Sequence, residues 1–359
     1  MKATKTLHDL GQSLWLDNIT RDLLDSGTLR RYVDELSVTG LTSNPTIFDH
    51  AIRNGSDYDA DIARAPAMSP EHFFFELALV DLRRAAELFL PIFNRTDGVD
   101  GWVSLEVSPF LAHDTERTLA AARDLHRRSG RPNLFIKIPG TAEGLPAIEA
   151  AIFAGVPVNV TLLFSREQYI AAAEAYLRGV ERRIEAGLSP AVASVASLFV
   201  SRWDVAVAGK VPEELTNQLG IAVAQRTYVA YQELLASARF RRAANAGARP
   251  QRLLWASTGT KDPKASDIFY VKALAAPFTV NTMPENTLNA FGDHGLVDEV
   301  LRPDGGECER VLGDFSKVGI DVDALAGRLQ NEGAASFVKS WNDLLACIES
   351  KSAKMRKAS

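Results

Sequence analysis

The chain contains 359 residues, of which 46% are hydrophobic, and it carries a formal net charge of -5 with a pI near 5.8. This length can bury a large core as one α/β domain or as two smaller domains. The acidic balance gives no electrostatic argument for binding nucleic acid or an anionic membrane, and no apolar run is long enough to span a bilayer.

The ends of the chain and its cysteines indicate a cellular compartment. The first residues, MKATKTLHDLGQSLWLDN, lack the apolar stretch and the small-residue cleavage site of a secretory signal. Cys308 and Cys347 are far apart and lie outside any CxxC or Cys/His spacing, so we expect reduced thiols. Together these features predict a cytoplasmic protein.

Short apolar segments recur along the chain, and longer helical patterns separate them. The expected strands are 13–18, 37–44, 101–108, 133–139, 156–164, 192–199, 252–258 and 277–284. The strongest expected helices are 21–36, 69–93, 114–129, 165–187 and 212–244. Alternating strands and helices are typical of a parallel sheet, and eight such units favour a (β/α)8 TIM barrel of class α/β.

A doubly wound sheet is the competing architecture, but neither GxGxxG nor GxxxxGK[ST] follows any expected strand. No linker or internal repeat divides the chain, which predicts a single barrel domain over residues 1–350. We interpret the additional helices after residue 294 as packing elements that cover the bottom of the barrel or form a subunit interface. The basic end, residues 351–359, is expected to be a flexible tail.

The segment NLFIKIP, residues 133–139, places Lys137 among apolar residues of an expected buried strand. A lysine ammonium is costly to bury, and a desolvated lysine loses its proton more easily. A neutral amine attacks carbonyl carbons and forms a Schiff base. Two interpretations follow: Lys137 is such a nucleophile, or it forms a structural ion pair with Glu106.

Other polar residues lie near the C-terminal ends of strands, where barrel enzymes hold their sites. Side chains alternate along a strand, so an inward-pointing set would share one pocket. That set is Asp17, Asn44, Glu106, Lys137, Asn159, Thr161, Ser197, Ser257 and Asn281. Asp17 and Glu106 suit proton transfer, and the Thr161 hydroxyl could position a water. Structural roles also stay open: helix capping for Asn44 and a helix-terminal charge for Asp17. The hydroxyl groups of Ser104, Ser108, Ser257 and Thr161 could equally be hydrogen-bonded parts of the barrel wall.

Basic residues after the sixth and seventh strands suit a phosphate group. Arg202 follows the sixth strand, and Lys261 lies in STGTKDPK after the seventh. The competing role for Arg202 is an ion pair with Asp204 or with another carboxylate at the rim of the barrel. The six histidines lie on helices or connections without HxH or HExxH spacing, so the sequence predicts no metal site and no cofactor.

The motifs LWLDN, GLTSNPTIF, SLEVSP, LFIKIPGT, VNVTLLFS and ASLFVSRWD follow one another in the order found in transaldolases, and NTMPENTL resembles the longer bacterial branch. The resemblance extends from residue 12 to about residue 345. It implies a class I, Schiff-base enzyme of the pentose phosphate pathway with phosphorylated sugars as partners, and no nucleic acid or membrane. Such an enzyme transfers a dihydroxyacetone unit from sedoheptulose 7-phosphate to glyceraldehyde 3-phosphate, giving erythrose 4-phosphate and fructose 6-phosphate. A homo-oligomer is left open.

The resemblance also implies residue roles. Lys137 would form the Schiff base, Asp17 would be the acid/base at the donor's C4 hydroxyl, and Glu106 and Thr161 would hold a proton-relaying water. Substrate binding would fall to Asn44, Asn159, Ser197, Phe199, Arg202, Ser257 and Lys261.

The match has two departures. Many members read Ser-Thr-Glu-Val-Asp where this chain has Ser104-Leu105-Glu106-Val107-Ser108, and the shorter branch carries an arginine where we place Lys261. A lysine gives a point charge rather than a bidentate fork. Two other functions stay open: a class I aldolase, in which water protonates the enamine, and a catalytically silent barrel that binds sugar phosphates.

Overall fold

The computed structural model describes residues 2–64 and 68–358. Within these ranges eight parallel strands form a closed barrel in which each strand pairs with the next along the chain and β8 pairs with β1. The strands are β1 (Ser13–Asp17), β2 (Val38–Thr42), β3 (Val103–Glu106), β4 (Leu134–Pro139), β5 (Val158–Leu163), β6 (Ser194–Phe199), β7 (Gln251–Ala256) and β8 (Val280–Met283). The predicted TIM barrel is therefore confirmed.

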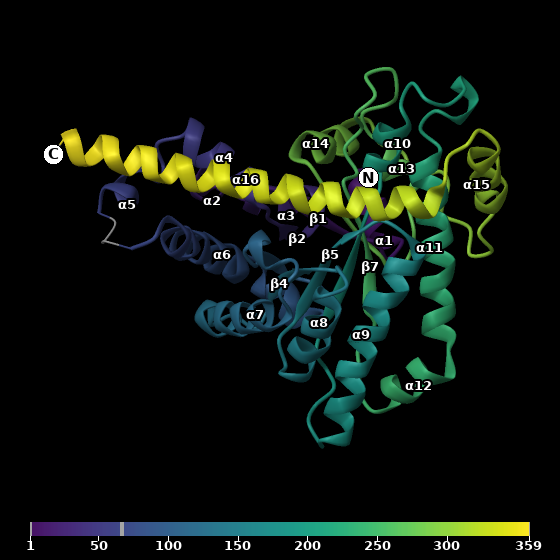
Figure 1. Ribbon diagram of the computed structural model, residues 1–359, viewed down its shortest axis with the longest axis horizontal. Helices are drawn as coiled ribbons and strands as arrows, with labels where there is room; N and C mark the ends of the chain where they lie inside the picture. Colours follow the sequence, from purple (N-terminus) through teal and green to yellow (C-terminus); the bar gives the residue numbers. More distant parts are fainter. Residues whose placement is uncertain (1, 65–67, 359) are drawn as a thin grey trace.

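Helices surround the barrel and cross one end of it (Figure 1). In the first half of the chain they are α1 (Ala3–Asp9), α2 (Arg21–Asp25), α3 (Thr28–Leu36), α4 (Pro45–Asn54), α5 (Asp59–Ala63), α6 (Pro70–Arg95), η1 (Pro109–Leu111), α7 (Thr115–Ser129) and α8 (Gly144–Phe153). In the second half they are α9 (Arg166–Glu185), α10 (Ser201–Val207), η2 (Glu213–Leu215), α11 (Leu219–Ala236), α12 (Ala238–Asn245), α13 (Phe269–Ala273), α14 (Glu285–His294), α15 (Cys308–Lys317) and α16 (Val322–Ala358).

The two faces of the strands belong to two different apolar clusters. Trp15 and Phe135 pack in one cluster inside the barrel, with their rings 6.1 Å apart. Their neighbours in sequence, such as Leu14 and Ile136, belong to the cluster between strands and helices. Because both faces are buried, the strands read as nearly continuous apolar runs.

One position inside the barrel requires glycine. A Cβ atom added to Gly40 on β2 would lie 2.6 Å from the carbonyl oxygen of Trp102 and 2.7 Å from Nε1 of Trp15. These distances are shorter than van der Waals contact, and one of the two atoms belongs to rigid backbone. The absent side chain therefore lets the Trp15 indole fill the lower part of the barrel.

Two segments that the sequence predicts as single helices are each divided into shorter helices, so these two predictions are wrong. The segment 21–36 divides into α2 and α3, because Gly27 adopts a left-handed conformation with φ of +74° between them. The segment 212–244 divides into η2, α11 and α12, and Ser237 caps α12 by accepting a hydrogen bond from the Phe240 amide at 3.1 Å. In each segment the local backbone interrupts an apolar pattern that continues through it.

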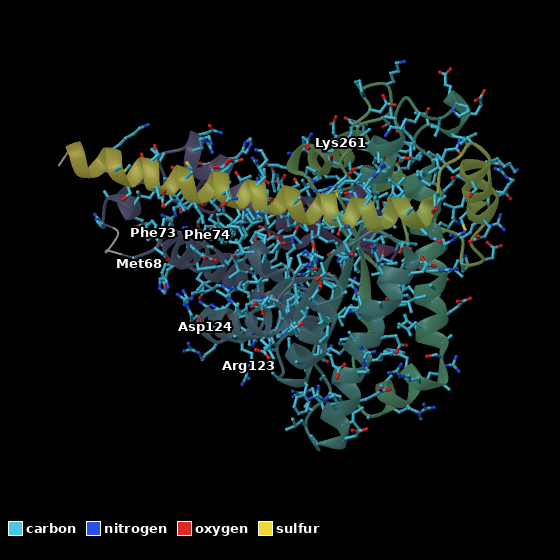
Figure 2. All side chains as sticks on the ribbon, viewed as in Figure 1. Met68, Phe73, Phe74, Arg123, Asp124 and Lys261 are labelled. Atoms are coloured by element: carbon cyan, nitrogen blue, oxygen red, sulfur yellow. The ribbon has the colours of Figure 1, made fainter. Side chains whose placement is uncertain are left out.

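The long helix α16 corrects the interpretation of the C-terminal helices. It packs against α4, α5, α6, η1 and β5, and it runs across the molecule beside them (Figure 1). Phe74 of α6 lies beside it (Figure 2), with its ring 5.0 Å from that of Trp341. The helix thus covers the end of the barrel at which the strands terminate, not the bottom.

The single domain over residues 1–350 and the flexible tail stay predictions, although α16 extends through the tail segment as far as Ala358. Among the described residues, no helix combines the length and the apolar character needed to cross a membrane.

Candidate active site

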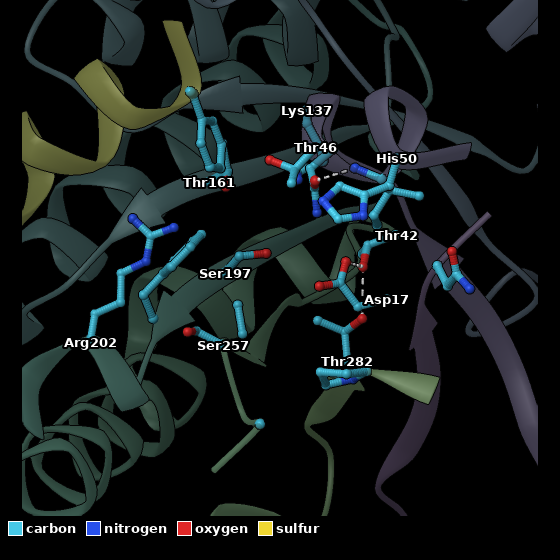
Figure 3. Close-up of a pocket in the computed structure, with 18 of the residues that line it drawn as sticks. Asp17, Thr42, Thr46, His50, Lys137, Thr161, Ser197, Arg202, Ser257 and Thr282 are labelled. Atoms are coloured by element: carbon cyan, nitrogen blue, oxygen red, sulfur yellow. Dashed lines mark hydrogen bonds between the residues drawn. The ribbon is translucent and has the colours of Figure 1, made fainter. Parts of the chain in front are cut away.

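A cavity of about 680 Å³ opens at the C-terminal end of the barrel (Figure 3). Most of the site residues predicted from the sequence line it: Asp17, Asn44, Lys137, Thr161, Ser197, Phe199, Arg202, Ser257 and Lys261. Glu106 and Asn159 lie directly beneath its wall, hydrogen-bonded to Lys137 and Ser197 respectively. The strand ends therefore bring together residues that are far apart in sequence.

Strand register places the central residues in one row. Glu106 on β3 pairs with Lys137 on β4, and Lys137 pairs with Asn159 on β5. Neighbouring strands lie about 4.8 Å apart, so these three inward side chains are immediate neighbours. The row sits within the barrel, where little water reaches it.

Lys137 is almost completely enclosed, with 7% of its side chain exposed. Its Nζ atom donates to the carbonyl oxygen of Ser43 at 3.0 Å and to Oε2 of Glu106 at 3.2 Å. The ion pair that the sequence allowed is thus present, and it lies at the wall of the cavity rather than away from it.

Burial acts strongly on both carboxyl groups of the site. Desolvation raises the pKa of Glu106, and the neighbouring Lys137 charge partly opposes this effect. Desolvation also raises the pKa of Asp17, again opposed by Lys137 and by a hydrogen bond from Thr42. Both groups therefore hold a proton more readily than exposed carboxyl groups do, as acid/base residues must.

A chain of hydroxyl groups orients Asp17 (Figure 3). Oγ1 of Thr42 donates to Oδ1 of Asp17 at 2.8 Å, and Oγ1 of Thr282 lies 2.7 Å from that of Thr42. Since Thr42 has one proton and gives it to Asp17, Thr282 must donate to Thr42. This fixes one carboxylate oxygen and leaves the other free to face the cavity. Asp17 is the last residue of β1, whereas Thr20 caps α2 and Asp22 is the acidic residue of the first turn of that helix.

Amide and hydroxyl groups form the next part of the wall. Nδ2 of Asn159 donates to Oγ of Ser104 at 3.2 Å, and Oγ of Ser197 donates to Oδ1 of Asn159 at 2.7 Å. Oγ1 of Thr161 is buried and has no hydrogen-bond partner among the described residues. A buried hydroxyl without a protein partner beside a cavity is placed to bind a water or a substrate oxygen.

Asn44 has the capping role that the sequence left open, and it also lines the cavity. Its Oδ1 atom accepts a hydrogen bond from the Ile47 amide at 3.1 Å at the start of α4.

In the motif that departs from transaldolases, Ser108 is buried and its hydroxyl has no partner within the described chain.

The cationic side of the cavity belongs to Arg202. Its guanidinium carbon lies 5.0 Å from the Phe199 ring centre, and burial lowers its pKa. Arg202 makes no ion pair with any carboxylate of the described residues. The alternative pairing with Asp204 is wrong, because that carboxylate accepts hydrogen bonds from the Leu219 amide and the Tyr270 hydroxyl.

Two further groups lie near the cationic side. Oγ of Ser257 is 2.9 Å from Oγ of Ser201, and the backbone of Ser257 is left-handed with φ of 56°. This conformation turns the chain immediately after β7. Lys261 lines the cavity from the following loop and is exposed (Figure 2).

One predicted site residue points elsewhere. On β8, Thr282 faces the cavity and Val280 packs inside the barrel. Side chains alternate along the strand, so Asn281 lies on the opposite face with Met283, which packs against the helices. The prediction that Asn281 enters the pocket is therefore wrong.

The sequence analysis also missed residues that line the cavity. His50 comes from α4, where Ile47, His50 and Ala51 share a face at helical spacing, so a count from Asn44 would have found it. Phe337 comes from α16, and no signal in the sequence connects that helix to the site. No group of three or more His, Cys, Asp or Glu residues in the described ranges could hold a metal ion.

The chemistry of the site follows from its enclosed amine. A lysine between proton-holding carboxyl groups can form an imine with a carbonyl compound and move protons to and from it. The Arg202 guanidinium, which has no ion-pair partner within residues 2–64 and 68–358, offers a place for an anionic group on the same compound.

Known proteins and a family model match this sequence over nearly its whole length. Residues 14–348 match the family described as Transaldolase/Fructose-6-phosphate aldolase. A transaldolase from Thermobifida fusca (strain YX) is 46% identical over 350 residues, which cover 94% of this chain and 95% of the relative. One from Saccharopolyspora erythraea is 46% identical over 353 residues, covering 96% of both chains. One from Thiobacillus denitrificans is 44% identical and covers 97% of this chain and all of its own, 100%.

A solved structure of a putative fructose-1,6-biphosphate aldolase from Coccidioides immitis covers 95% of this chain and 92% of its own. Its sequence identity is 11% and its TM-score is 0.31.

Proposed function

The chain belongs to the transaldolase/fructose-6-phosphate aldolase family and has transaldolase activity, and we propose that Lys137 carries this reaction through a Schiff base with a ketose phosphate. The donor is sedoheptulose 7-phosphate or, in the reverse direction, fructose 6-phosphate. The acceptor is the aldose phosphate, glyceraldehyde 3-phosphate or erythrose 4-phosphate. This is the transfer step of the pentose phosphate pathway.

The first step is imine formation. Nζ of Lys137 attacks the ketone carbon, and the resulting carbinolamine loses water to give an iminium ion. Oε2 of Glu106 lies 3.2 Å from Nζ, within reach for proton transfer. Because burial raises the pKa of Glu106, this carboxyl group readily takes a proton. A water bound to the Thr161 hydroxyl, which has no partner in the part of the chain that the structure describes, would extend the proton path.

The second step breaks the C3–C4 bond. Asp17 removes the proton of the C4 hydroxyl, the bonding pair moves toward the iminium nitrogen, and an aldehyde departs from the enamine. In the transfer step the enamine carbon attacks the acceptor aldehyde, and Asp17 returns a proton to the new hydroxyl group. The hydrogen bond from Thr42 at 2.8 Å supports this role, since it leaves one Asp17 oxygen for the substrate.

The remaining side chains would bind the substrate. Asn44, Asn159 and Ser197 offer donors and acceptors to the hydroxyl groups of the dihydroxyacetone unit, and Phe199 forms an apolar wall. Arg202 would bind the phosphate, because it lies in the cavity wall without an ion-pair partner in the described chain. Ser257 and Lys261 lie on the loop after β7 and would complete the phosphate site.

The observation that carries the proposal is the enclosed Lys137 amine at the cavity wall. The test is to incubate the protein with fructose 6-phosphate, reduce with borohydride and map the modified peptide by mass spectrometry. We expect a reduced three-carbon adduct on Lys137, which requires both the imine and C–C cleavage. Lys137→Ala should give no adduct and no transfer while keeping the circular dichroism spectrum of the folded barrel. No adduct in folded wild-type protein would contradict the Schiff-base assignment.

Family membership also supports phosphorylated sugars as partners and a cytoplasmic location. A homo-oligomer stays a prediction.

A further inference from the structure

Helix α16 is attached to the strands that carry the reacting groups. Nε2 of Gln330 donates to the carbonyl oxygens of Gly140 and Leu162, each at 3.0 Å. Leu162 lies near the end of β5, which carries Thr161, and Gly140 directly follows β4, which carries Lys137. One amide group therefore holds the helix across both strand ends.

The helix lies unusually close to the site three residues further on. A Cβ atom on Gly333 would lie 2.9 Å from Cδ2 of Leu162 and 3.3 Å from Nη1 of Arg202. Any larger residue at this position would have to displace the ends of the Leu162 and Arg202 side chains. The backbone of α16 thus rests directly against the cavity wall.

Phe337 extends this face of the helix over the cavity. Residues 330, 333 and 337 follow helical spacing and share one face. The Phe337 ring centre is 6.0 Å from Nζ of Lys137 and 5.9 Å from the guanidinium carbon of Arg202. The side chain is 8% exposed, and Trp341, one turn further along, packs against α6. The ring is therefore held between two anchored turns.

The position of the ring matters for the enamine that the proposed function requires. In transfer, the nucleophilic carbon of the enamine forms a C–C bond with the acceptor aldehyde, and the nitrogen becomes an iminium again. In the competing reaction that carbon takes a proton from water or a water-borne acid, and water then hydrolyses the iminium to free dihydroxyacetone and the lysine amine. Neither transfer nor release needs a reactant other than the aldehyde or water. The access of water to the nucleophilic carbon of the enamine therefore determines which of the two reactions occurs.

We propose that Phe337 is a specificity-determining residue that keeps solvent from the enamine, so that the three-carbon unit is transferred to an aldehyde rather than released. This inference rests on the proposed function. The water needed to form and hydrolyse the imine would bind at the Thr161 hydroxyl, which has no hydrogen-bond partner within the described structure. The aromatic face also favours the iminium cation, because cations within about 6 Å of a ring centre are attracted to it.

The test measures two products from one donor. Fructose 6-phosphate is supplied alone or with erythrose 4-phosphate, and free dihydroxyacetone and sedoheptulose 7-phosphate are quantified. Phe337→Ala removes the cover, Phe337→Gln keeps the length of the side chain but brings a polar group, and Phe337→Leu keeps an apolar cover. Phe278→Ala is the matched control, since this phenylalanine is 73% exposed and lies just before β8, at the opposite end of the barrel.

We expect the ratio of release to transfer to rise about tenfold in the Ala and Gln variants, which corresponds to about 1.4 kcal/mol in relative barrier height. The Leu variant and the Phe278→Ala control should stay near wild type. Borohydride should still trap an adduct on Lys137 in every variant. Thermal melts establish which variants fold. If the Ala variant does not fold, comparison of the Gln and Leu variants tests the inference.

Three outcomes would overturn the inference. An unchanged ratio in folded Ala and Gln variants would show that the ring does not control water access. A Leu variant that releases as much as the Gln variant would contradict the role of apolar cover. An equal rise in Phe278→Ala would show that the effect is not local to the cavity. If wild-type protein gave no adduct on Lys137, the proposed function itself would fail instead.

Discussion

Asp204 gives a direct test of how the cationic side of the cavity is built. It lies two residues after Arg202 and is 6% exposed. Oδ1 accepts a hydrogen bond from the Leu219 amide at 2.9 Å, and Oδ2 accepts one from the Tyr270 hydroxyl at 2.8 Å. Burial raises the pKa of this carboxyl group from 3.8 to about 6, against the opposing effect of these hydrogen bonds. The perturbation is Asp204→Asn, which removes the titration and nearly preserves the shape.

The magnitude follows from linkage between protonation and folding. A rise of about 2 pH units at about 1.36 kcal/mol each corresponds to about 3 kcal/mol. Because the folded-state pKa is raised, the folded protein holds this proton more tightly than the unfolded chain. The carboxyl group's contribution to the free energy of unfolding is therefore full below pH 4, falls as the pH rises through about 6, and then stays low.

The assay is urea unfolding followed by tryptophan fluorescence at several pH values between 4 and 7.5. The quantity compared is the wild-type free energy of unfolding minus that of the variant, and we expect it to fall by about 2.5 kcal/mol across this range, most of it below pH 6. A constant offset from altered hydrogen bonds does not affect this change. Asp34→Asn, at an exposed position of α3, should show no such change.

The sign of the result separates two arrangements. If Asp204 were paired with Arg202, the positive charge would lower the pKa of the carboxyl group, and wild type would gain stability relative to the variant as the pH rises. That outcome, or a flat difference, would refute the arrangement of α10, α11 and α13 around Asp204.

Two other substitutions test the catalytic and binding assignments. Thr42→Val should lower kcat about tenfold with little change in KM, as loss of one hydrogen bond to a charged group suggests. In the wild type the hydrogen bond from Thr42 lowers the pKa of Asp17, so its removal should raise this pKa and move the acid limb of the pH–rate profile to higher pH. An acid limb that does not move would contradict the positioning role of Thr42. Arg202→Ala should raise KM for fructose 6-phosphate by about 10–100-fold, the range for a charge-assisted hydrogen bond of about 1.5–3 kcal/mol. Turnover of unphosphorylated fructose should not change, and an equal loss with both sugars would remove Arg202 from the phosphate site.

Much of the fold could be predicted from the sequence because barrel strands are marked by their own residues. Each strand is a short apolar run between helical patterns, and the closed order β1 to β8 follows from repeating the same unit. The residues of the central row were also identifiable, since Lys137 and Glu106 interrupt buried segments and Asn159 shares their position on its strand. Polar residues in buried segments are costly, so their presence indicates a specific structural or functional role.

The rest depended on information that is not local. Both faces of a barrel strand are buried, so the pattern around Asn281 did not show which face was inward, and Thr282 was overlooked. Gly27 ends a helix although the apolar pattern continues past it. Phe337 reaches the site because Gln330 and Gly333 fix the path of α16, and these contacts join residues more than 160 positions apart.

The buried pair of Lys137 and Glu106 is better explained by reactivity than by stability. An enclosed ion pair costs desolvation energy that its own attraction often fails to recover, so apolar residues of the same size would stabilise the barrel at least as well. The same desolvation raises the pKa of Glu106, so this carboxyl group takes up a proton more readily beside the amine than an exposed carboxyl group would. Enclosure of the pair depends on the cover above it, to which Phe337 of α16 contributes. In our proposals, the reactivity of the amine and the exclusion of water from its enamine are therefore two consequences of one packed helix.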